Sequence, residues 1–196
     1  MSYSSLLQDV YDLTKRPDLV AETAIGVKTA TLQLHSSDFY SKDLYETGIS
    51  FTTSDYLQTL DYKLLLPRWR QIKYLRKYDA VGLTAGKKLD PIVIEKVLDG
   101  YKIERTDVFY LAGSVYQIKC STQEQYFLLG AYLFPDVNPT TFTSWIADEY
   151  PYAVAFKAAS IALKMVGLMD VADTFERQSI IFANEIASAN ITTVGE

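Results

Sequence analysis

Residues 106–121, TDVFYLAGSVYQIKCS, decide the fold of this chain. Two runs rich in β-branched and aromatic residues meet at Ala112, Gly113 and Ser114, a composition typical of a β-hairpin turn. The run QEQYFLLGAYLF at 123–134 follows and supplies a third strand. We therefore expect a small antiparallel meander over residues 106–134.

In the N-terminal segment of the chain, up to about Ser36, the apolar residues recur at helical spacing. The pattern predicts a short helix that ends near Leu13 and a second helix that begins at Pro17 and ends near Ser36. Proline suits the first turn of a helix because its missing N–H would have no partner there. The N-terminal region is therefore expected to be helical.

Between the helices and the meander, the sequence becomes aromatic and β-branched. ISFTTS at 49–54 is a candidate strand, and RWRQIKYLRKYD at 68–79 favours a strand because of its aromatic content. VGLTAGKKLDP at 81–91 has the composition of a loop. These segments are expected to complete a β-rich centre.

The C-terminal third again has helical periodicity. AVAFKAASIALKMV at 153–166 predicts a helix that ends at Gly167, and Asp170 can cap a last helix. Apolar or small residues repeat about every 3.5 residues along that last helix; they are Leu168, Ala172, Phe175, Ser179, Phe182, Ile186 and Ala189. This pattern predicts a helical hairpin with one face to bury.

These patterns together predict an α+β fold, with the N-terminal and C-terminal helices packed as a helical bundle and a central antiparallel β-sheet lobe. Residues 1–47 and 140–196 are expected to form one helical core, and residues 48–139 the β-rich lobe.

The composition is that of a chain with a core of its own. The 196 residues are 48% hydrophobic, and the single cysteine, Cys120, cannot form an internal disulfide. No apolar run approaches the roughly 20 residues needed to span a bilayer, and MSYSSLLQDVYDL lacks the basic and apolar segments of a signal peptide. We expect a protein made in the cytoplasm that is neither exported nor inserted in a membrane.

The sequence contains no recognisable catalytic motif. The only histidine, His35, is expected at the solvent edge of a helix end, and Cys120 in a strand as a buried or half-buried bystander. GLTAGKK lacks both the spacing and the Ser or Thr of a phosphate-binding loop, so it favours a turn between strands. Acidic pairs such as Asp148 with Glu149 suit helix starts. We expect no enzyme activity, cofactor or metal.

One stretch has an unusual charge. Residues 63–88 hold eight basic residues and one acid, a local charge of +7 in a chain whose formal net charge is −5, which leaves −12 for the remainder. Within it, cations alternate with aromatic rings; the candidate interface residues are Arg68, Trp69, Arg70, Lys73, Tyr74, Arg76 and Lys77.

Three interpretations of this stretch remain open. The favoured one is a contact with an acidic partner protein, since Tyr, Trp and Arg are enriched at interfaces. A plain solvated face is the second. Direct contact with nucleic acid, through phosphates and stacked bases, is the third; it defines an alternative function as a nucleic-acid-binding module, whose affinity would fall steeply with salt.

Three strings carry a resemblance to a known family. VYDLTKRPDLVAETAIGVKTATLQLHSSDFYSKDL at the N-terminus, the central DVFYLAGSVYQI, and SWIADEYPYAVAFKAAS before the last hairpin resemble the head-to-tail connector, or adaptor, proteins of tailed bacteriophages. In length and helix–sheet–helix order the chain is similar to tail tubular protein A of short-tailed phages. The resemblance covers nearly the whole chain and lies in the character of the residues in these strings and in the order of the expected helices and strands.

The resemblance implies a non-enzymatic structural protein of the virion neck. Members of such families form rings of about twelve copies below the portal protein, extend the DNA channel and dock the next tail component. It implies four contacts: the portal, a distal tail or nozzle protein, further copies of the chain, and genomic DNA that passes through during ejection without sequence recognition. In the terminal helices, Phe175, Phe182 and Ile186 are candidate interface residues.

Overall fold

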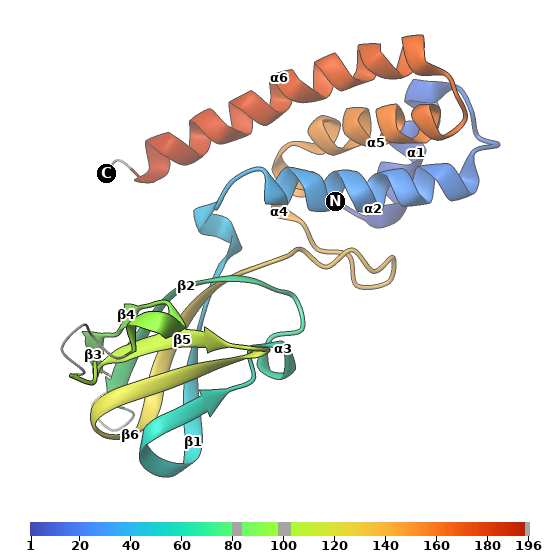
Figure 1. The fold of residues 1–196 in the computed structure, drawn as a ribbon. Helices are drawn as coiled ribbons and strands as arrows, with labels where there is room; N and C mark the ends of the chain where they lie inside the picture. The colour runs from blue at the N-terminus through green and yellow to red at the C-terminus, as the bar shows by residue number, and fades with distance from the viewer. Residues whose placement is uncertain (80–83, 98–102, 195–196) are drawn as a thin grey trace. The chain divides into compact units, whose positions relative to one another are not determined.

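The computed structural model describes residues 1–79, 84–97 and 103–194 (Figure 1). In that part of the chain there are six α-helices and six β-strands, and the strands form one nearly closed sheet, so the fold is α+β. The chain divides into a helical unit, residues 1–43 with 134–196, and a β unit, residues 44–133.

The helical unit is organised around one alanine-rich helix, α5. The elements are α1 (Tyr3–Thr14), α2 (Val20–Ser36), the 3₁₀ turn η1 (Ser41–Asp43), α4 (Trp145–Glu149), α5 (Pro151–Met165) and α6 (Met169–Val194). Helix α5 packs against α1, α2, α4 and α6, and Figure 1 shows it between α2 and α6. The buried core includes Leu6, Val10, Val27, Ala30, Leu34, Val154, Ala158 and Ile186.

Small side chains allow α2 and α5 to lie very close together. A Cβ atom placed on Gly26 of α2 would lie 2.7 Å from the carbonyl oxygen of Ala158 in α5. Ala155, Ala159 and Ala162 of α5 are also fully buried. The spacing of these two helices therefore depends on the absence of a side chain at residue 26.

The ends of the helices follow the sequence signals, with one correction. Gly167 has φ +80°, the N–H of Leu168 bonds to the carbonyl of Leu163, and α5 ends as predicted. The expected start of the second helix at Pro17 is wrong, because α2 begins at Val20. The preceding residues form a turn in which the Leu19 N–H donates to the carbonyl of Arg16.

The β unit is organised around one long strand, β6. The elements are β1 (Leu44–Leu60), α3 (Tyr62–Leu65), β2 (Trp69–Asp79), β3 (Thr84–Lys88), β4 (Asp90–Pro91), the 3₁₀ turn η2 (Ile94–Lys96), β5 (Val108–Ala112) and β6 (Val115–Leu133). The strand order is β3-β2-β6-β5-β4, and β1 also pairs with β6. The core side chains include Ile49, Leu60, Leu75, Phe109, Ile118, Phe127 and Leu129.

The predicted hairpin is confirmed, whereas the predicted third strand is wrong. Strands β5 and β6 are antiparallel, and their turn contains Gly113 at φ +64°. The run at 123–134 does not start a new strand, because β6 continues through the polar residues 121–124 and only its register against β1 shifts, near Asp55. There the backbone N–H of Ser121 donates to the carboxylate of Asp107.

The remaining strand predictions have different outcomes. Strand β2 confirms the prediction at 68–79, and ISFTTS lies inside the longer strand β1. The expected loop at 81–91 is wrong over residues 84–88, which pair with β2 as strand β3, and over 90–91, which form β4. Because β4 pairs with β5 in parallel, the expected antiparallel sheet is mixed at this edge. Residues 81–83 of that segment lie outside the described residues.

Candidate interaction surfaces

The basic stretch of the β unit is not one uniform cationic surface. Arg68 and Lys73 are exposed, whereas Arg70, Arg76 and Lys77 are half-buried. Strand β2 turns Leu75 into the core, and two register shifts against β6 interrupt the alternation of its side chains. The seven candidate residues thus have different environments.

Two of the cations lie over tyrosine rings of the same unit. The Lys73 Nζ is 5.6 Å from the ring centre of Tyr132, and the Arg76 Cζ is 5.5 Å from that of Tyr74. The Tyr74 ring also covers Gly130, where a Cβ atom would lie 2.6 Å from the ring. Both rings are therefore already in contact with cations of their own chain.

Two further cations, Lys77 and Lys87, form ion pairs with Asp107. Its carboxylate accepts from Lys87 at 2.9 Å and lies 3.1 Å from the Nζ of Lys77. Burial opposes ionisation of Asp107, but hydrogen bonds from the Ser121 N–H, Lys87, the Ser121 hydroxyl and Lys77 outweigh it and lower its pKa. Burial also opposes the charge on Lys77, yet the contact with Asp107 raises its pKa.

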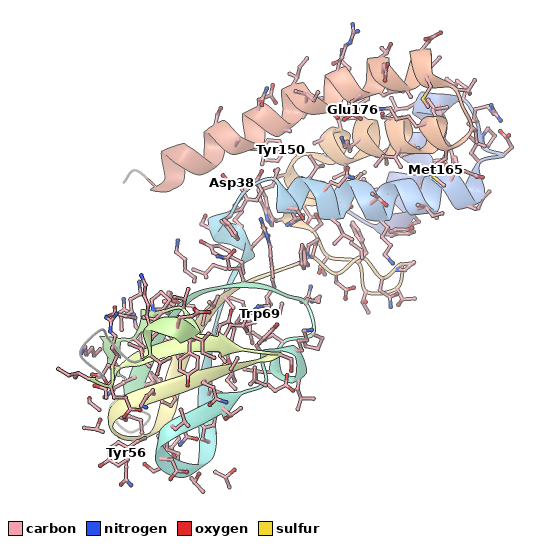
Figure 2. All side chains as sticks on the ribbon, viewed as in Figure 1. Asp38, Tyr56, Trp69, Tyr150, Met165 and Glu176 are labelled. Carbon is pink, nitrogen blue, oxygen red and sulfur yellow. The ribbon has the colours of Figure 1, made fainter. Side chains whose placement is uncertain are left out.

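The end of the β unit that carries α3 is aromatic. Ring centres of Tyr62, Trp69 and Tyr116 lie 4.8–5.8 Å apart, and Phe109 is 5.9 Å from Tyr116; Trp69 is labelled in Figure 2. Leu64 and Leu65 follow Tyr62 in α3, and Leu111 lies opposite Tyr116; all three leucines are exposed, and Leu64 is 83% exposed. Phe109 is buried and forms the floor beneath these rings. We call the surface the aromatic end: Tyr62, Trp69 and Tyr116, with Leu64, Leu65 and Leu111.

The candidate residues of the last helix lie against the rest of the helical unit. Phe175 and Phe182 are half-buried and stack on Phe156 of α5, with ring centres 6.0 and 5.8 Å apart. Ile186 is 1% exposed and belongs to the core. The structure thus gives Ile186 a packing role, which corrects the expectation that its side chain faces a partner.

Five exposed apolar side chains of the helical unit lie close together in sequence around the turn between α5 and α6, while others, such as Val20, Ile25 and Tyr152, lie elsewhere in the unit. Met165, labelled in Figure 2, is exposed, as are Val166, Leu168, Met169 and Val171. We call these five residues the apolar turn. Lys164 and Asp173 flank it and form a long ion pair of 3.6 Å. The periodic pattern placed Leu168 on the face to be buried, which is wrong, because Leu168 precedes α6 and is exposed at the turn.

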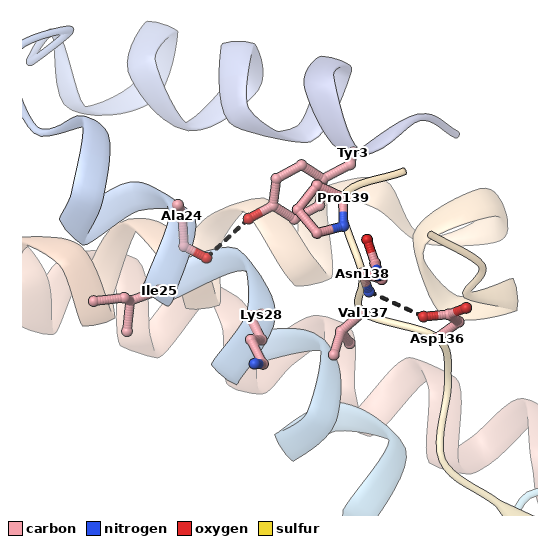
Figure 3. A pocket seen from close by; sticks show the side chains of 8 residues that line it. All are labelled: Tyr3, Ala24, Ile25, Lys28, Asp136, Val137, Asn138 and Pro139. Atoms are coloured by element: carbon pink, nitrogen blue, oxygen red, sulfur yellow. Dashed lines mark hydrogen bonds between the residues drawn. The ribbon is translucent and has the colours of Figure 1, made fainter. Parts of the chain in front are cut away.

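A groove of about 560 Å³ lies in the helical unit between α2 and the segment 136–139 (Figure 3). The Tyr3 hydroxyl donates to the carbonyl oxygen of Ala24, and the Asn138 N–H donates to Asp136. The groove walls are thus held by hydrogen bonds within the unit. Lys28, which is exposed, is the cation among the lining residues.

His35 has an environment that the sequence did not predict. Its ring is 1% exposed, which corrects the expected place at the solvent edge. Nδ1 lies 2.8 Å from Oδ1 of Asp43 and Nε2 lies 2.9 Å from Oγ of Ser144, while the indole N–H of Trp145 donates to the same Asp43 oxygen. His35 and Ser144 are 109 positions apart, so no local pattern could have found this network.

This arrangement has the order of a Ser–His–Asp triad but lacks access to substrate. Ser144 is 5% exposed, and its Oγ accepts the N–H of Ala147 as the N-cap of α4. A nucleophile must reach a substrate carbonyl, and here the hydroxyl is enclosed. In this structure the network is a buried set of hydrogen bonds that links α2, η1 and α4.

The single cysteine of the chain is also enclosed. Cys120 is buried in the β unit, and burial raises the pKa of its thiol to about 11. Among residues 1–79, 84–97 and 103–194, no three His, Cys, Asp or Glu side chains are placed to hold a metal ion. In the same ranges no helix is both long and apolar enough to cross a bilayer.

The two units differ in charge. The helical unit contains fourteen acidic and seven basic residues, a formal charge of −7, and the β unit contains ten acidic and twelve basic residues, a charge of +2. Comparison with models of protein families and with curated proteins finds no match. The residues and geometry of the chain itself must therefore carry any functional argument.

Proposed function

We propose that the protein is a structural head-to-tail adaptor of a tailed bacteriophage. One observation carries the proposal: the chain has two units with opposite formal charge, and each unit has its own core and its own exposed apolar surface. A subunit of this kind can present two different faces to its neighbours, as every closed ring with head-to-tail contacts requires.

In the proposed assembly about twelve copies form a ring below the portal protein, in the neck of the virion. The terminal helices form a bundle that contacts the portal and neighbouring copies, and the β lobe faces the distal tail or nozzle protein. Genomic DNA passes through the ring without sequence recognition. An acidic channel wall would repel DNA phosphates and help the genome to slide during ejection, with residues 63–88 at a protein contact.

The enclosed reactive groups favour a structural role over catalysis. Ser144 and His35 are buried in the helical unit, and Cys120 is buried in the β unit. Each has bonding or packing partners within its own unit, and none faces an open cleft of the described surface. We therefore propose a non-enzymatic protein.

The nucleic-acid-binding alternative depends on the same basic stretch. Lys77 and Lys87 already bond to Asp107, and the rings of Tyr74 and Tyr132 lie under Arg76 and Lys73. Fewer cations and ring faces are thus available for phosphates and bases than the sequence suggested. This geometry favours the protein contact.

The decisive experiment is sedimentation of the full chain, alone and mixed with portal rings of the same phage. The adaptor proposal expects a shift of the chain onto the portal in a multiple near twelve. A chain that ignores the portal but shifts with short DNA, and loses that shift as salt rises, would overturn the proposal and support the alternative.

A further inference from the structure

We infer that the aromatic end of the β unit docks onto the apolar turn of the helical unit of a second copy of this chain. The inference rests on the proposed function, since it names the two faces that would form the head-to-tail contact in the ring.

The aromatic end has the chemistry of an interface centre. Tyr62, Trp69 and Tyr116 are half-buried, and their hydroxyl and indole N–H groups have no hydrogen-bond partner among the described residues. Burial, together with the neighbouring Tyr62, raises the pKa of Tyr116, so this hydroxyl remains a neutral donor. Tyrosine and tryptophan dominate binding energies when a partner excludes water from them.

Cations flank this aromatic surface. Lys63 follows Tyr62 and Arg68 precedes Trp69, and both are exposed. The nearby acid, Asp61, caps α3 by accepting the N–H groups of Lys63 and Leu64 at 3.1 Å. The surface therefore favours a partner that combines aliphatic side chains with negative charge.

The apolar turn of the helical unit has this complementary composition. Met165, Leu168 and Met169 are exposed, and methionine adapts readily to the shape of an aromatic partner. Asp170 and Asp173 lie beside them and are exposed. The carboxylate of Asp170 has no partner among the described residues, and Asp173 has only its long contact with Lys164.

A second copy fits because each chain carries both faces. The aromatic end belongs to the unit of charge +2 and the apolar turn to the unit of charge −7, so contact between copies pairs opposite charges and continues from copy to copy. A contact of this kind is heterologous and closes into a ring or extends as a filament. Each patch alone is small, so we expect weak association of free chains that strengthens when a ring closes.

The test uses full-length chains and sedimentation equilibrium over a range of concentrations. One variant reverses the charges beside the aromatic end (Lys63→Glu with Arg68→Glu). A second reverses the charges beside the apolar turn (Asp170→Lys with Asp173→Lys), and a third carries all four changes. We expect each two-residue variant to weaken self-association by about tenfold or more, and the four-residue variant to recover to within about threefold of the original chain.

Matched controls separate this contact from general charge effects. Lys88→Glu with Lys96→Glu changes the net charge equally at exposed positions of the β unit outside the aromatic end, and should leave association unchanged. Leu64→Ser alters a side chain that is 83% exposed, so it should weaken association without affecting thermal unfolding.

Three results would overturn the inference: an unaltered chain that stays monomeric up to about 1 mM, two-residue variants that associate like the original, or no recovery when the four changes are combined. Sedimentation with portal rings is scored separately. If the four-residue variant recovers but the original chain ignores the portal, the contact stands and the adaptor function fails. If portal binding occurs but reversal has no effect, the adaptor function stands and this contact fails.

Discussion

The Nδ1 atom of His35 lies 2.8 Å from Oδ1 of Asp43 inside the helical unit. When the ring is neutral, Nδ1–H donates to the carboxylate and Nε2 accepts the hydroxyl proton of Ser144. The network joins the end of α2, the turn η1 and the N-cap of α4, all of which lie close to the positions where the chain leaves and re-enters the helical unit. His35 bonds to both Asp43 and Ser144, so the loss of its ring removes a hydrogen bond from a buried polar atom of each.

The first prediction concerns the stability that this network provides. His35→Leu should lower the free energy of unfolding by about 2–4 kcal/mol, because it leaves buried polar groups of Asp43 and Ser144 without the ring. Ser144→Ala should lower it by about 1–2 kcal/mol through loss of the helix cap. Urea unfolding followed by circular dichroism measures both. Gln178→Ala on the exposed side of α6 is the control; an unchanged midpoint for His35→Leu would refute the network's role.

The second prediction concerns the triad-like geometry. We expect the protein not to accelerate hydrolysis of a small nitrophenyl ester, because Ser144 is 5% exposed and its hydroxyl cannot reach a carbonyl. The measurement compares the original chain with Ser144→Ala in a spectrophotometric assay. A rate that falls in Ser144→Ala, with the fold intact by circular dichroism, would show that the site opens and has hydrolytic chemistry.

The third prediction concerns the close approach of α2 and α5. In an exposed helix interior, replacement of glycine by alanine normally stabilises the helix by about 1 kcal/mol. Gly26→Ala should do the reverse, with a loss of about 1–3 kcal/mol, since its Cβ would lie 2.7 Å from the backbone oxygen of Ala158 and one helix would have to move. Thermal unfolding gives the sign directly, and a raised midpoint would contradict the packing of these helices.

Local signals predicted much of the secondary structure. The hairpin follows from a glycine that can adopt positive φ at residue 113, and the C-terminal helices follow from apolar periodicity and the glycine at residue 167. The continuity of β6 could not be predicted this way, because residues 121–124 look like a turn in sequence. They continue the strand, and Asp107, which directly precedes β5, accepts hydrogen bonds there from the backbone and the hydroxyl group of Ser121.

The candidate surfaces show the same limit. The basic stretch and Trp69 were visible in the sequence, but Tyr116 lies beside Trp69 because both β1 and β2 pair with β6. Lys77 looked like a free cation, although Asp107 lies 3.1 Å away in the fold. Charge and composition can be read from sequence, whereas the partner of each charge depends on strand register.

The fourth prediction concerns the pH dependence that Asp107 confers. Because its pKa is lower in the folded than in the unfolded chain, its contribution is fully present above about pH 4, the ordinary value of an aspartate, and is lost as pH falls through the folded pKa. Asp107→Asn should therefore be less stable than the original at pH 7, by a margin that shrinks in acid. Asparagine tolerates the positive φ of this residue, +57°.

Urea unfolding from pH 7 to pH 2 measures that margin. Asp90→Asn, which alters an exposed carboxylate of the same unit, should differ from the original by the same small amount at every pH. A margin for Asp107→Asn that stays constant or grows in acid would mean that the carboxylate is not held by Lys77, Lys87 and Ser121 as the structure has it.

The fifth prediction compares two glycines of the same sheet. A Cβ on Gly130 of β6 would lie 2.6 Å from the ring of Tyr74, whereas a Cβ on Gly48 of β1 would meet its nearest atom, in Tyr78, at 3.9 Å. Gly48→Ala should therefore be neutral or slightly stabilising, because alanine has less freedom in the unfolded chain. Gly130→Ala should lose about 1–2 kcal/mol, since the Tyr74 ring must swing away and leave Arg76 without its partner.

A double-mutant cycle checks the cause of that loss. With Tyr74→Ala already in place, Gly130→Ala meets no ring and should cost less than it does in the original chain, which gives a coupling of about 1 kcal/mol in urea unfolding. A cost for Gly130→Ala that is equal in both backgrounds would place the strain in the backbone of β6 rather than at the ring. The contact of the Tyr74 ring with Gly130 would then contribute little to the anchoring of β2, which would depend on its hydrogen bonds to β6 and on the burial of Leu75.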